Sequence, residues 1–447
     1  MPSSDVVVIG AGLAGMTAAI ALADAGARVE LVARGNAATH WTSGGLDVAA
    51  PRGSTSASDG IATLASLPGH PYAFLGGEVR PSVDWLRAIL AAEGLTYVGD
   101  LDEPLRTVPT AIGSTRRAAL LPTAQAAALT PWMPGERLVV CGITGFKDFW
   151  PGAIAASLQR HWVWGQAPGA GDRPAAVEPL VVELPGIAGR HNLTALHLAR
   201  LFDDPSWRVE AYGLISAALR GRGGAPDRVA LPAVLGLANH AAAFNEASQA
   251  LPLVPFEVPL ISPSVPGLRL FGALRDALRR RGGRISVGEE VVRVEAAGRR
   301  VTAVVAAAAA RDRVFRTGGV VLATGGIAGG GLIGRADGTL VEPLVGLSVE
   351  APAAAEWLAA DPFEPAGHPL EAAGIRTDAE LHPVDGRGRV VFDNVAIAGS
   401  LLAGQRYLSE RCGDGVAVAS GRRAAAMFVA NPTSKPPIER QRSAAAL

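Results

Sequence analysis

Hydrophobic residues form short uninterrupted runs at the start of this 447-residue chain. Val6 to Ile9 is a run of β-branched residues, which is typical of a buried strand, and the alanine-rich stretch 16–25 has the composition of a helix. A second apolar stretch, 27–34, reads ARVELVAR and predicts another strand. Gly10, Gly12 and Gly15 separate the first strand from the helix. The pattern therefore predicts a strand, a turn, a helix and a strand in that order.

The spacing of these glycines predicts a phosphate site. Gly10 permits the tight turn, Gly12 lets a pyrophosphate approach the backbone, and Gly15 lets the helix pack closely on the strand. The helix N-terminus adds free N–H groups and a partial positive charge. The alternative is a tight turn in an ordinary strand–helix–strand unit, so it is the flanking elements that favour nucleotide binding.

One part of a dinucleotide site is missing. An Asp or Glu about 20 residues after the glycines usually binds the adenosine ribose, but here the second strand ends in Ala33 and Arg34. Glu30 lies within the strand, before the usual position. This pattern is compatible with a mononucleotide such as FMN and also with an FAD held by other contacts.

The middle of the chain alternates polar loops with apolar runs. A glycine-rich loop at 35–51 contains His40 and the sequence Ser43, Gly44, Gly45, and a loop of this length beside a nucleotide site is more often functional than filler. An amphipathic helix is expected over 80–94. A second strand and helix, 136–159, lack a third glycine and begin an insertion that extends to about 262. It includes a Pro- and Gly-rich linker at 165–179, a helix at 191–202 and a strand at 228–237.

The last third predicts a meander between buried strands. An amphipathic helix at 266–281 ends at a glycine pair. Short strands at 284–287, 291–296, 301–308 and 314–316 predict an antiparallel meander. Buried strands are expected at 319–326 and 393–400, a loop at 401–415 and an alanine-rich helix at 416–430.

Charge and cysteine content exclude several classes of protein. The balance of 41 basic and 41 acidic residues provides no field that would attract nucleic acid or an acidic membrane surface. Two cysteines are too few for an iron–sulfur cluster, and we expect both to be reduced thiols in a cytosolic protein. No metal site, secretion signal or transmembrane helix is expected.

Three glycine-bearing stretches occur in a diagnostic order: GAGLAG, then ATGG after the meander, then NVAIAG before a glycine-started helix. This set resembles the flavoproteins with two dinucleotide-binding domains. The stretches RGNAATHWTSGGLDV, VVCGITGFKDF, HNLTALHLARLFDD and CGDGVAVASG are similar, in the same order, to the B-subunit family of anaerobic glycerol-3-phosphate dehydrogenase. The resemblance covers nearly the whole chain.

The resemblance implies an α/β fold. We expect a Rossmann-like flavin-binding domain with an antiparallel β-meander and an inserted α/β cap domain. The flavin-binding domain would comprise 1–135 and 263–430, the cap or substrate domain 136–262, and a flexible tail 431–447.

The resemblance also implies an activity and partners. In that family the enzyme oxidises sn-glycerol 3-phosphate to dihydroxyacetone phosphate. A catalytic A-type subunit would pair with this chain, and an iron–sulfur C-type subunit would pass electrons to a quinone. The chain would then be cytoplasmic and peripheral at the inner face of the cell membrane through a partner.

The B subunit of that family is generally assigned FMN, which agrees with Ala33, and FAD is the alternative. The spacing from His40 to Gly44 is shorter than in proteins with covalent flavin, so we expect a non-covalent cofactor. Four groups of residues are expected to hold it: Gly10, Gly12 and Gly15 at the phosphate; Ser43, Gly44 and Gly45 beside the isoalloxazine; Thr324, Gly325 and Gly326 over the nucleotide; and Gly399, Ser400, Gly413 and Gly415 facing the ring. Asp414 stands where the family tends to have glycine, and its carboxylate would oppose flavin reduction unless it caps the helix or points away.

For the reaction, a base must take the hydroxyl proton and arginines must hold the phosphate. The candidates are His40, Arg376 and His382, with Arg269 and Arg335 as further anion ligands; each also has a plain interpretation as a surface charge. Ala33 and Asp414 favour an alternative, a structural or electron-relay subunit without productive flavin. A second alternative is a fumarate-reductase-like flavin oxidoreductase acting on another substrate.

Overall fold

The computed structural model describes residues 4–163, 173–221, 227–307 and 311–429. The chain divides into two compact units: unit 1 comprises 1–37, 61–86 and 274–447, and unit 2 comprises 38–60 and 87–273. The expected insertion at 136–262 lies within unit 2, which also takes in residues on both sides of it. The expected tail, 431–447, lies outside the described residues.

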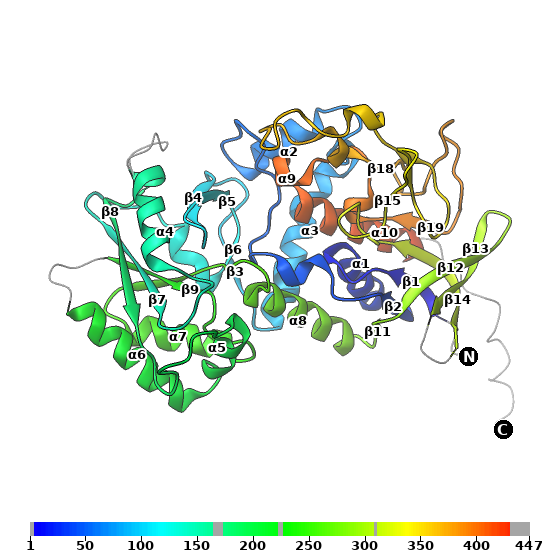
Figure 1. Ribbon diagram of the computed structural model, residues 1–447. Coiled ribbons are helices and arrows are strands. Elements are labelled where there is room, and N and C mark those ends of the chain that lie inside the picture. The colour runs from blue at the N-terminus through cyan, green and yellow to red at the C-terminus, as the bar shows by residue number, and fades with distance from the viewer. Residues whose placement is uncertain (1–3, 164–172, 222–226, 308–310, 430–447) are drawn as a thin grey trace, which may run out of the picture. The chain divides into compact units, whose positions relative to one another are not determined.

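Unit 1 is built on a seven-stranded sheet in the order β11-β2-β1-β14-β13-β12, with β19 beside β14 (Figure 1). The strands β11, β2, β1, β14 and β19 pair in parallel, and β12, β13 and the first half of β14 form the antiparallel meander. The bounds are β1 Ser4–Ile9, β2 Val29–Ala33, β11 Arg284–Val287, β12 Glu290–Ala297, β13 Arg300–Ala307, β14 Arg313–Leu322 and β19 Val395–Ile397. Val6 to Ile9 are buried because β1 has a neighbour on each side.

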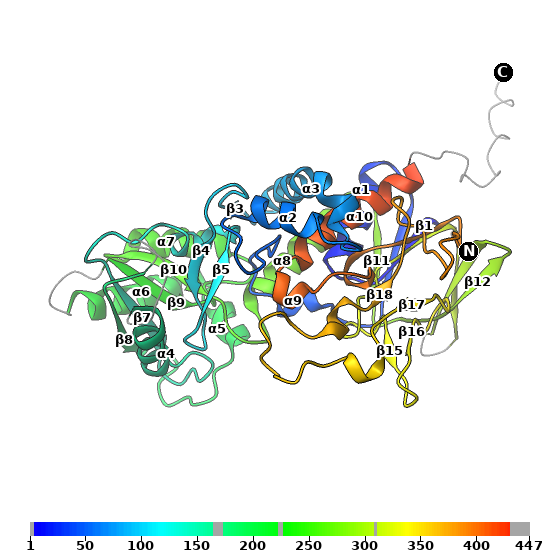
Figure 2. The same cartoon turned by 90° about the horizontal axis from the view of Figure 1, so that it is seen from above.

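The helices α1 and α10 pack against each other beside β1 and β19 (Figures 1 and 2). A Cβ on Gly421 would lie 2.5 Å from the carbonyl oxygen of Ala14, so this contact requires glycine. The remaining elements of unit 1, some shared with unit 2, are α1 Leu13–Asp24, α2 Ala57–Ala65, α3 Tyr72–Ala92, α8 Val265–Arg280, β15 Ile333–Gly334, β16 Leu340–Val341, β17 Val349–Glu350, β18 Gly374–Ile375, α9 Tyr407–Glu410 and α10 Gly413–Val429.

Four sequence-based expectations in unit 1 are wrong in detail. The strand 284–287 does not belong to the meander, since it pairs in parallel with β2. The expected strands 314–316 and 319–326 are one strand, β14, which pairs first with β13 and then with β1. The loop 401–415 contains α9, and α10 begins at Gly413 rather than at 416. Local patterns show apolar runs but not the partner of a strand, which is why the sequence suggests the wrong neighbour for β11.

Unit 2 contains a four-stranded parallel sheet in the order β10-β9-β7-β8. Large side chains fill its core, among them Phe149, Trp162, Phe202 and Phe256. The elements are β3 Tyr97–Val98, β4 Arg106–Pro109, β5 Thr115–Ala118, β6 Leu121–Pro122, β7 Arg137–Ile143, α4 Pro151–Leu158, β8 Ala176–Val182, α5 Ala195–Leu201, α6 Pro205–Arg220, β9 Arg228–Pro232, α7 His240–Ala250 and β10 Val254–Val258. Parallel strands connected through helices confirm the α/β character expected of the cap.

Among the described residues, no helix is both long and apolar enough to cross a membrane.

Candidate functional site

The turn after β1 contains three glycines. Protein atoms fill the space beside two of them, whereas the space beside the third is empty. A Cβ on Gly10 would lie 2.2 Å from the carbonyl oxygen of Ala323, and one on Gly15 would lie 2.0 Å from the carbonyl oxygen of Gly10. A Cβ on Gly12 would have no neighbour within 4 Å. Gly12 is the N-cap of α1, so this open space adjoins the free N–H groups of the helix. It suits the phosphate of a flavin nucleotide.

β14 and β19 are parallel to β1, and their carboxyl ends lie beside this turn. The N–H of Gly326 donates to Oγ of Ser400 at 3.0 Å, which joins the loops that follow the two strands. Gly325 has a φ of +83°, a conformation that favours glycine. Oγ1 of Thr324 is buried without a hydrogen-bond partner among the described atoms, and a bound ligand commonly satisfies such a group.

Gly399 serves the packing of α1 and α10. Its φ is +74°, and a Cβ here would lie 2.8 Å from that of Ala14. Its N–H donates to Oγ of Ser420 at 2.9 Å. The glycine therefore fixes the end of β19 against both helices.

Gly413 and Gly415 lie in the first turn of α10, with Asp414 between them. The partial positive charge of a helix N-terminus favours a carboxylate at this position. This placement agrees with an interaction of Asp414 with its own helix, the alternative in which it does not oppose flavin reduction.

A buried cluster secures the turn that leads into α10. Nδ1 of His70 accepts the N–H of Tyr72 at 3.0 Å, so the ring proton is on Nε2, which lies 3.3 Å from Oε2 of Glu410. Sγ of Cys412 lies 3.5 Å from the same oxygen, and burial raises the pKa of this thiol, with the charge of Glu410 adding to the rise. A histidine with both nitrogens engaged offers no lone pair to a cation. The cluster thus positions the start of α10.

In unit 2, the segment Ser43 to Gly45 is packed tightly by its surroundings. A Cβ on Gly44 would lie 2.7 Å from Cβ of Pro266, and one on Gly45 would lie 2.5 Å from Nη2 of Arg116. The hydroxyl of Tyr97 donates to the carbonyl of Gly44 at 2.5 Å. These contacts hold the backbone of the segment in one conformation.

His40 precedes this segment and is buried. Its ring packs against that of Phe271, with 4.1 Å between the centroids. A Cβ on Gly267 would lie 2.5 Å from the carbonyl oxygen of Thr39, so the start of α8 is in direct contact with this backbone. The catalytic role of His40 stays a prediction.

The other catalytic candidates lie at the surface of unit 1. Arg376 is 3.2 Å from Glu350, and Nδ1 of His382 is 3.0 Å from Oδ2 of Asp378. Arg335 is exposed just after β15. The roles of Arg376 and His382 also stay predictions.

The acid that usually binds adenosine is missing from the end of β2. Ala33 ends β2, and the guanidinium of Arg34 lies 3.3 Å from the position of a Cβ on Gly330, in the loop after β14. Arg34 pairs with Glu290 at 3.5 Å. The carboxyl end of β2 therefore carries an alanine where FAD usually finds a carboxylate, and the Arg34–Glu290 pair lies beside it.

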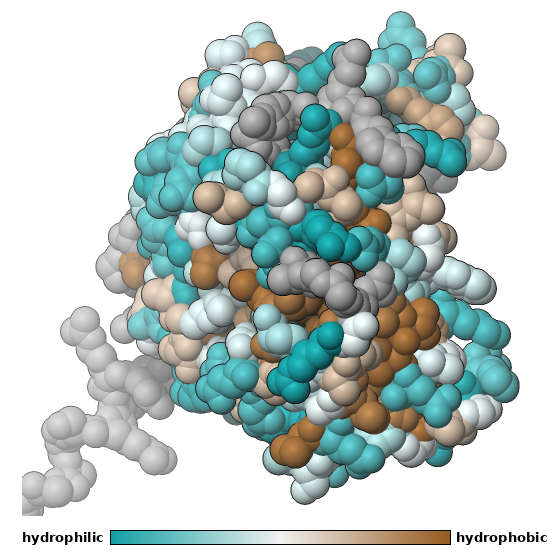
Figure 3. All heavy atoms as spheres, turned by 90° about the vertical axis from the view of Figure 1, so that its left-hand side faces the viewer, coloured by the Kyte–Doolittle hydropathy of each residue, from teal (hydrophilic) through white to brown (hydrophobic). Residues whose placement is uncertain are grey.

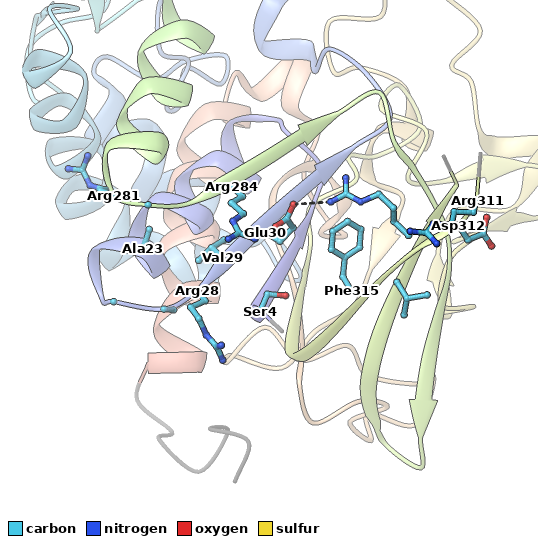
Figure 4. A pocket seen from close by; sticks show the side chains of 15 residues that line it. Ser4, Ala23, Arg28, Val29, Glu30, Arg281, Arg284, Arg311, Asp312 and Phe315 are labelled. Atoms are coloured by element: carbon cyan, nitrogen blue, oxygen red, sulfur yellow. Dashed lines mark ion pairs between the residues drawn. The ribbon is translucent and has the colours of Figure 1, made fainter. Parts of the chain in front are cut away.

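A cavity in unit 1 lies at the opposite end of the parallel strands from the glycine turn. It measures about 670 Å³ and is lined by the starts of β1 and β2 and by Phe315 of β14 (Figure 4). Three of its arginines form ion pairs: Arg28 with Asp5, Arg281 with Asp24 and Arg313 with Glu30. Because the glycine turn follows the end of β1, this cavity is not the nucleotide site.

A smaller cavity, of about 160 Å³, lies within unit 2. It brings together Arg269, a candidate from the sequence, and His240, which sequence reasoning missed. A lone histidine at a helix start belongs to no motif, so only the fold could have indicated it.

Comparisons with known proteins agree with this architecture. The family described as "FAD binding domain" matches residues 5–416. The B subunit of anaerobic glycerol-3-phosphate dehydrogenase from Yersinia enterocolitica is 32% identical over 446 residues, which cover 95% of this chain and 97% of the relative. The probable B subunit of the same enzyme from Halobacterium salinarum is 31% identical over 431 residues, covering 94% and 96%.

Solved structures are more distant. A 3-ketosteroid Δ1-dehydrogenase from Sterolibacterium denitrificans is 11% identical with a TM-score of 0.45, covering 96% of this chain and 100% of that one. The open conformation of a flavocytochrome c3 fumarate reductase is 11% identical with a TM-score of 0.44, covering 96% and 78%. Likeness at this level supports no conclusion about the site. From the matched domain and the sequence relatives, the chain belongs to the family of flavin-binding oxidoreductases that includes the B subunit of anaerobic glycerol-3-phosphate dehydrogenase.

Proposed function

We propose that this chain is the flavoprotein B subunit of an anaerobic glycerol-3-phosphate dehydrogenase complex. It would take part in oxidising sn-glycerol 3-phosphate to dihydroxyacetone phosphate, with electrons passing to a quinone through an iron–sulfur partner. The observation that carries this proposal is the similarity to relatives of that name along 95% of the chain. The open space at Gly12 supports the flavin part of it.

FMN is the proposed cofactor, held without a covalent bond. An alanine rather than an acidic residue at the end of β2 favours a nucleotide without adenosine. Gly12 and the start of α1 would bind the phosphate, and the loops after β14 and β19 would enclose the nucleotide. The segment Ser43 to Gly45 would border the isoalloxazine. When bound, the flavin supplies the acceptor for hydride from the carbinol carbon.

The residues of this chain would bind and orient the substrate. A base must take the hydroxyl proton, and the candidates His40 and His382 differ in setting: His40 is buried, whereas the side chain of His382 is 21% exposed and lies beside Asp378. Arg376 would bind a phosphate only by exchanging its surface pairing with Glu350.

The chain must also present surfaces to its partners, here proposed as a catalytic A-type subunit and an iron–sulfur C-type subunit. Apolar residues gather on the face of unit 2 seen in Figure 3. Unit 2 exposes several large apolar side chains, among them Trp150 at 67%, Val181 at 57% and Val209 at 72%. Exposed apolar surface of this kind suits contact with another protein. Such a complex would place the chain at the cytoplasmic face of the membrane through a partner.

The test is to purify the chain alone and together with its two proposed partners. The visible spectrum is recorded, the chromophore is released by heat and compared with FMN and FAD by chromatography, and glycerol 3-phosphate-dependent reduction of a quinone analogue is measured. We expect FMN in the chain, and activity that requires it in the complex. FAD would show that other contacts hold the adenosine, and a chain that stays colourless after reconstitution would support the alternative of a structural subunit. Flavin without glycerol 3-phosphate oxidation by the complex would favour another substrate.

A further inference from the structure

The small cavity of unit 2 is enclosed by segments from distant parts of the chain. Residues 94–96 and 122–124 form one wall, the start of α7 a second and the start of α8 a third. Its volume of about 160 Å³ is well below the roughly 300–1,000 Å³ of sites for drug-sized ligands. The cavity therefore suits a molecule of a few heavy atoms and excludes a flavin.

The first residue of α7, His240, lines the cavity with an unsatisfied imidazole. Both ring nitrogens are buried, and neither makes a hydrogen bond of good geometry with the described atoms, although the backbone of Leu237 and Gly94 lies near the ring. Burial lowers the pKa of His240 and the charge of Arg269 lowers it further, while Glu257 and weaker contacts with the backbone of Leu237 and Gly94 act in the opposite direction. The ring is therefore neutral at pH 7, with one nitrogen able to donate and the other to accept.

Arg269 contributes spare donors without a net charge. Its Nη1 and Nη2 donate to the two carboxylate oxygens of Glu257 at 2.6 and 3.0 Å, and its Nε donates to the carbonyl of Gly236 at 2.8 Å. A guanidinium has five N–H groups, so these bonds leave two of them. Because Glu257 is fully buried beside it, the pair is electrically balanced and favours a hydroxylated ligand over a bare anion.

The cavity also adjoins the segment expected to border the isoalloxazine. Pro122 and Pro266 line it, and the same two residues lie 3.4 and 2.7 Å from the position of a Cβ on Gly44. The hydroxyls of Thr96 and Thr123, which lie 2.6 Å apart, add polar groups to the wall next to these prolines. Two proline rings thus separate this small cavity from the backbone of Gly44.

We propose that this cavity binds the hydroxyl-bearing carbons of a small polyol, with His240 and Arg269 making hydrogen bonds to its hydroxyl groups. Two molecules could supply these hydroxyl-bearing carbons: free glycerol, and glycerol 3-phosphate through its glycerol part. The second source rests on the proposed function, since it would make the cavity part of the substrate site. His240 would then make a hydrogen bond to the substrate, and no sequence motif indicates this role.

The test follows the imidazole of His240 itself. Histidine is labelled with ¹³C in the full chain, the His240 signal is assigned by comparison with His240→Gln, and glycerol, glycerol 3-phosphate and inorganic phosphate are titrated separately. We expect a saturable shift of this signal with at least one of the two polyols and none with phosphate. His197, which is half-buried on α5 beside Arg190 and lies outside the cavity lining, should not respond.

Two substitutions on α7 provide a matched pair. Ala241 and Ala242 are both exposed, but only Ala241 lines the cavity. Ala241→Leu should weaken polyol binding about tenfold or more by occupying the cavity, whereas Ala242→Leu should leave binding unchanged. Flavin content, measured in the same samples, should be equal in both variants, which separates failure of this site from failure of the flavin proposal. Saturable binding of phosphate alone, no response to either polyol, or equal binding by the two leucine variants would each overturn the proposal.

Discussion

Each unit has a parallel sheet in which a central strand runs into a glycine-containing turn and then a helix, yet the two turns differ in what surrounds them. After β1, the space in front of Gly12 is empty of protein. Near the end of β7, a Cβ on Gly142 would lie 2.6 Å from Cγ of Pro151, and in the turn that follows one on Gly145 would lie 1.9 Å from the carbonyl oxygen of Arg190. Gly142 and Gly145 therefore admit the chain's own atoms, whereas Gly12 leaves room for a ligand.

The largest effect is expected where the turn of unit 1 contacts its own chain. In Gly10→Ala, the new Cβ would clash with the carbonyl of Ala323, and the φ of +112° is unfavourable for alanine. We expect the free energy of unfolding to fall by about 3 kcal/mol or more. Urea denaturation measures this loss, and a stability equal to that of the unsubstituted chain would show that the turn has another conformation.

For Gly12→Ala we expect a smaller loss of stability than for Gly10→Ala, but a larger loss of bound flavin. The new Cβ meets no protein atom, so the cost is limited to a poorer N-cap, about 1 kcal/mol. It would occupy the space proposed for the phosphate, and we expect flavin affinity to fall by about tenfold or more. Flavin absorbance per chain after gel filtration measures this.

Gly145→Ala is the matched control for that experiment. Its φ is +81°, and its Cβ would clash with the carbonyl of Arg190, so stability should decrease while the folded fraction keeps its flavin. If both variants lost flavin in proportion to stability, the contrast between the two turns would be invalid.

The smallest expected effect concerns one histidine in each unit, His70 and His240. His70 in unit 1 has partners for both nitrogens, whereas His240 in unit 2 makes no hydrogen bond of good geometry with the described atoms. Because the pKa of His240 is lowered in the folded chain, the unfolded chain binds more protons between that pKa and the ordinary value of about 6.5. Stability should therefore decrease as the pH falls below about 6.5.

The variant His240→Gln should remove this part of the pH dependence, as measured by urea denaturation at several pH values. In unit 1, Glu410 should contribute to the pH dependence in stronger acid. Burial opposes the charge of Glu410, but hydrogen bonds from His70 and from the backbone of Arg406 lower its pKa below 4.5. Its contribution is present above that value and is lost as the pH falls through the lowered pKa. An unchanged slope near pH 6 in His240→Gln would contradict the assignment of a lowered pKa to His240.

The amino-acid sequence by itself determined the local features of the flavin domain. The spacing of Gly10, Gly12 and Gly15 depends on neighbours along the chain, so the turn and its helix could be predicted from residues alone. The apolar runs of β1, β2 and β14 indicated buried strands for the same reason.

Only the tertiary structure decided which of these features face each other. The partner of β11 lies about 250 residues earlier in the chain, and no local pattern records such a pairing. The binding role proposed for His240 depends on Arg269 on α8 and on residues near 95 and 123, which folding brings to the same cavity. The difference between Gly12 and Gly145 is likewise invisible in the sequence, because the space beside a glycine is set by atoms from distant segments of the chain.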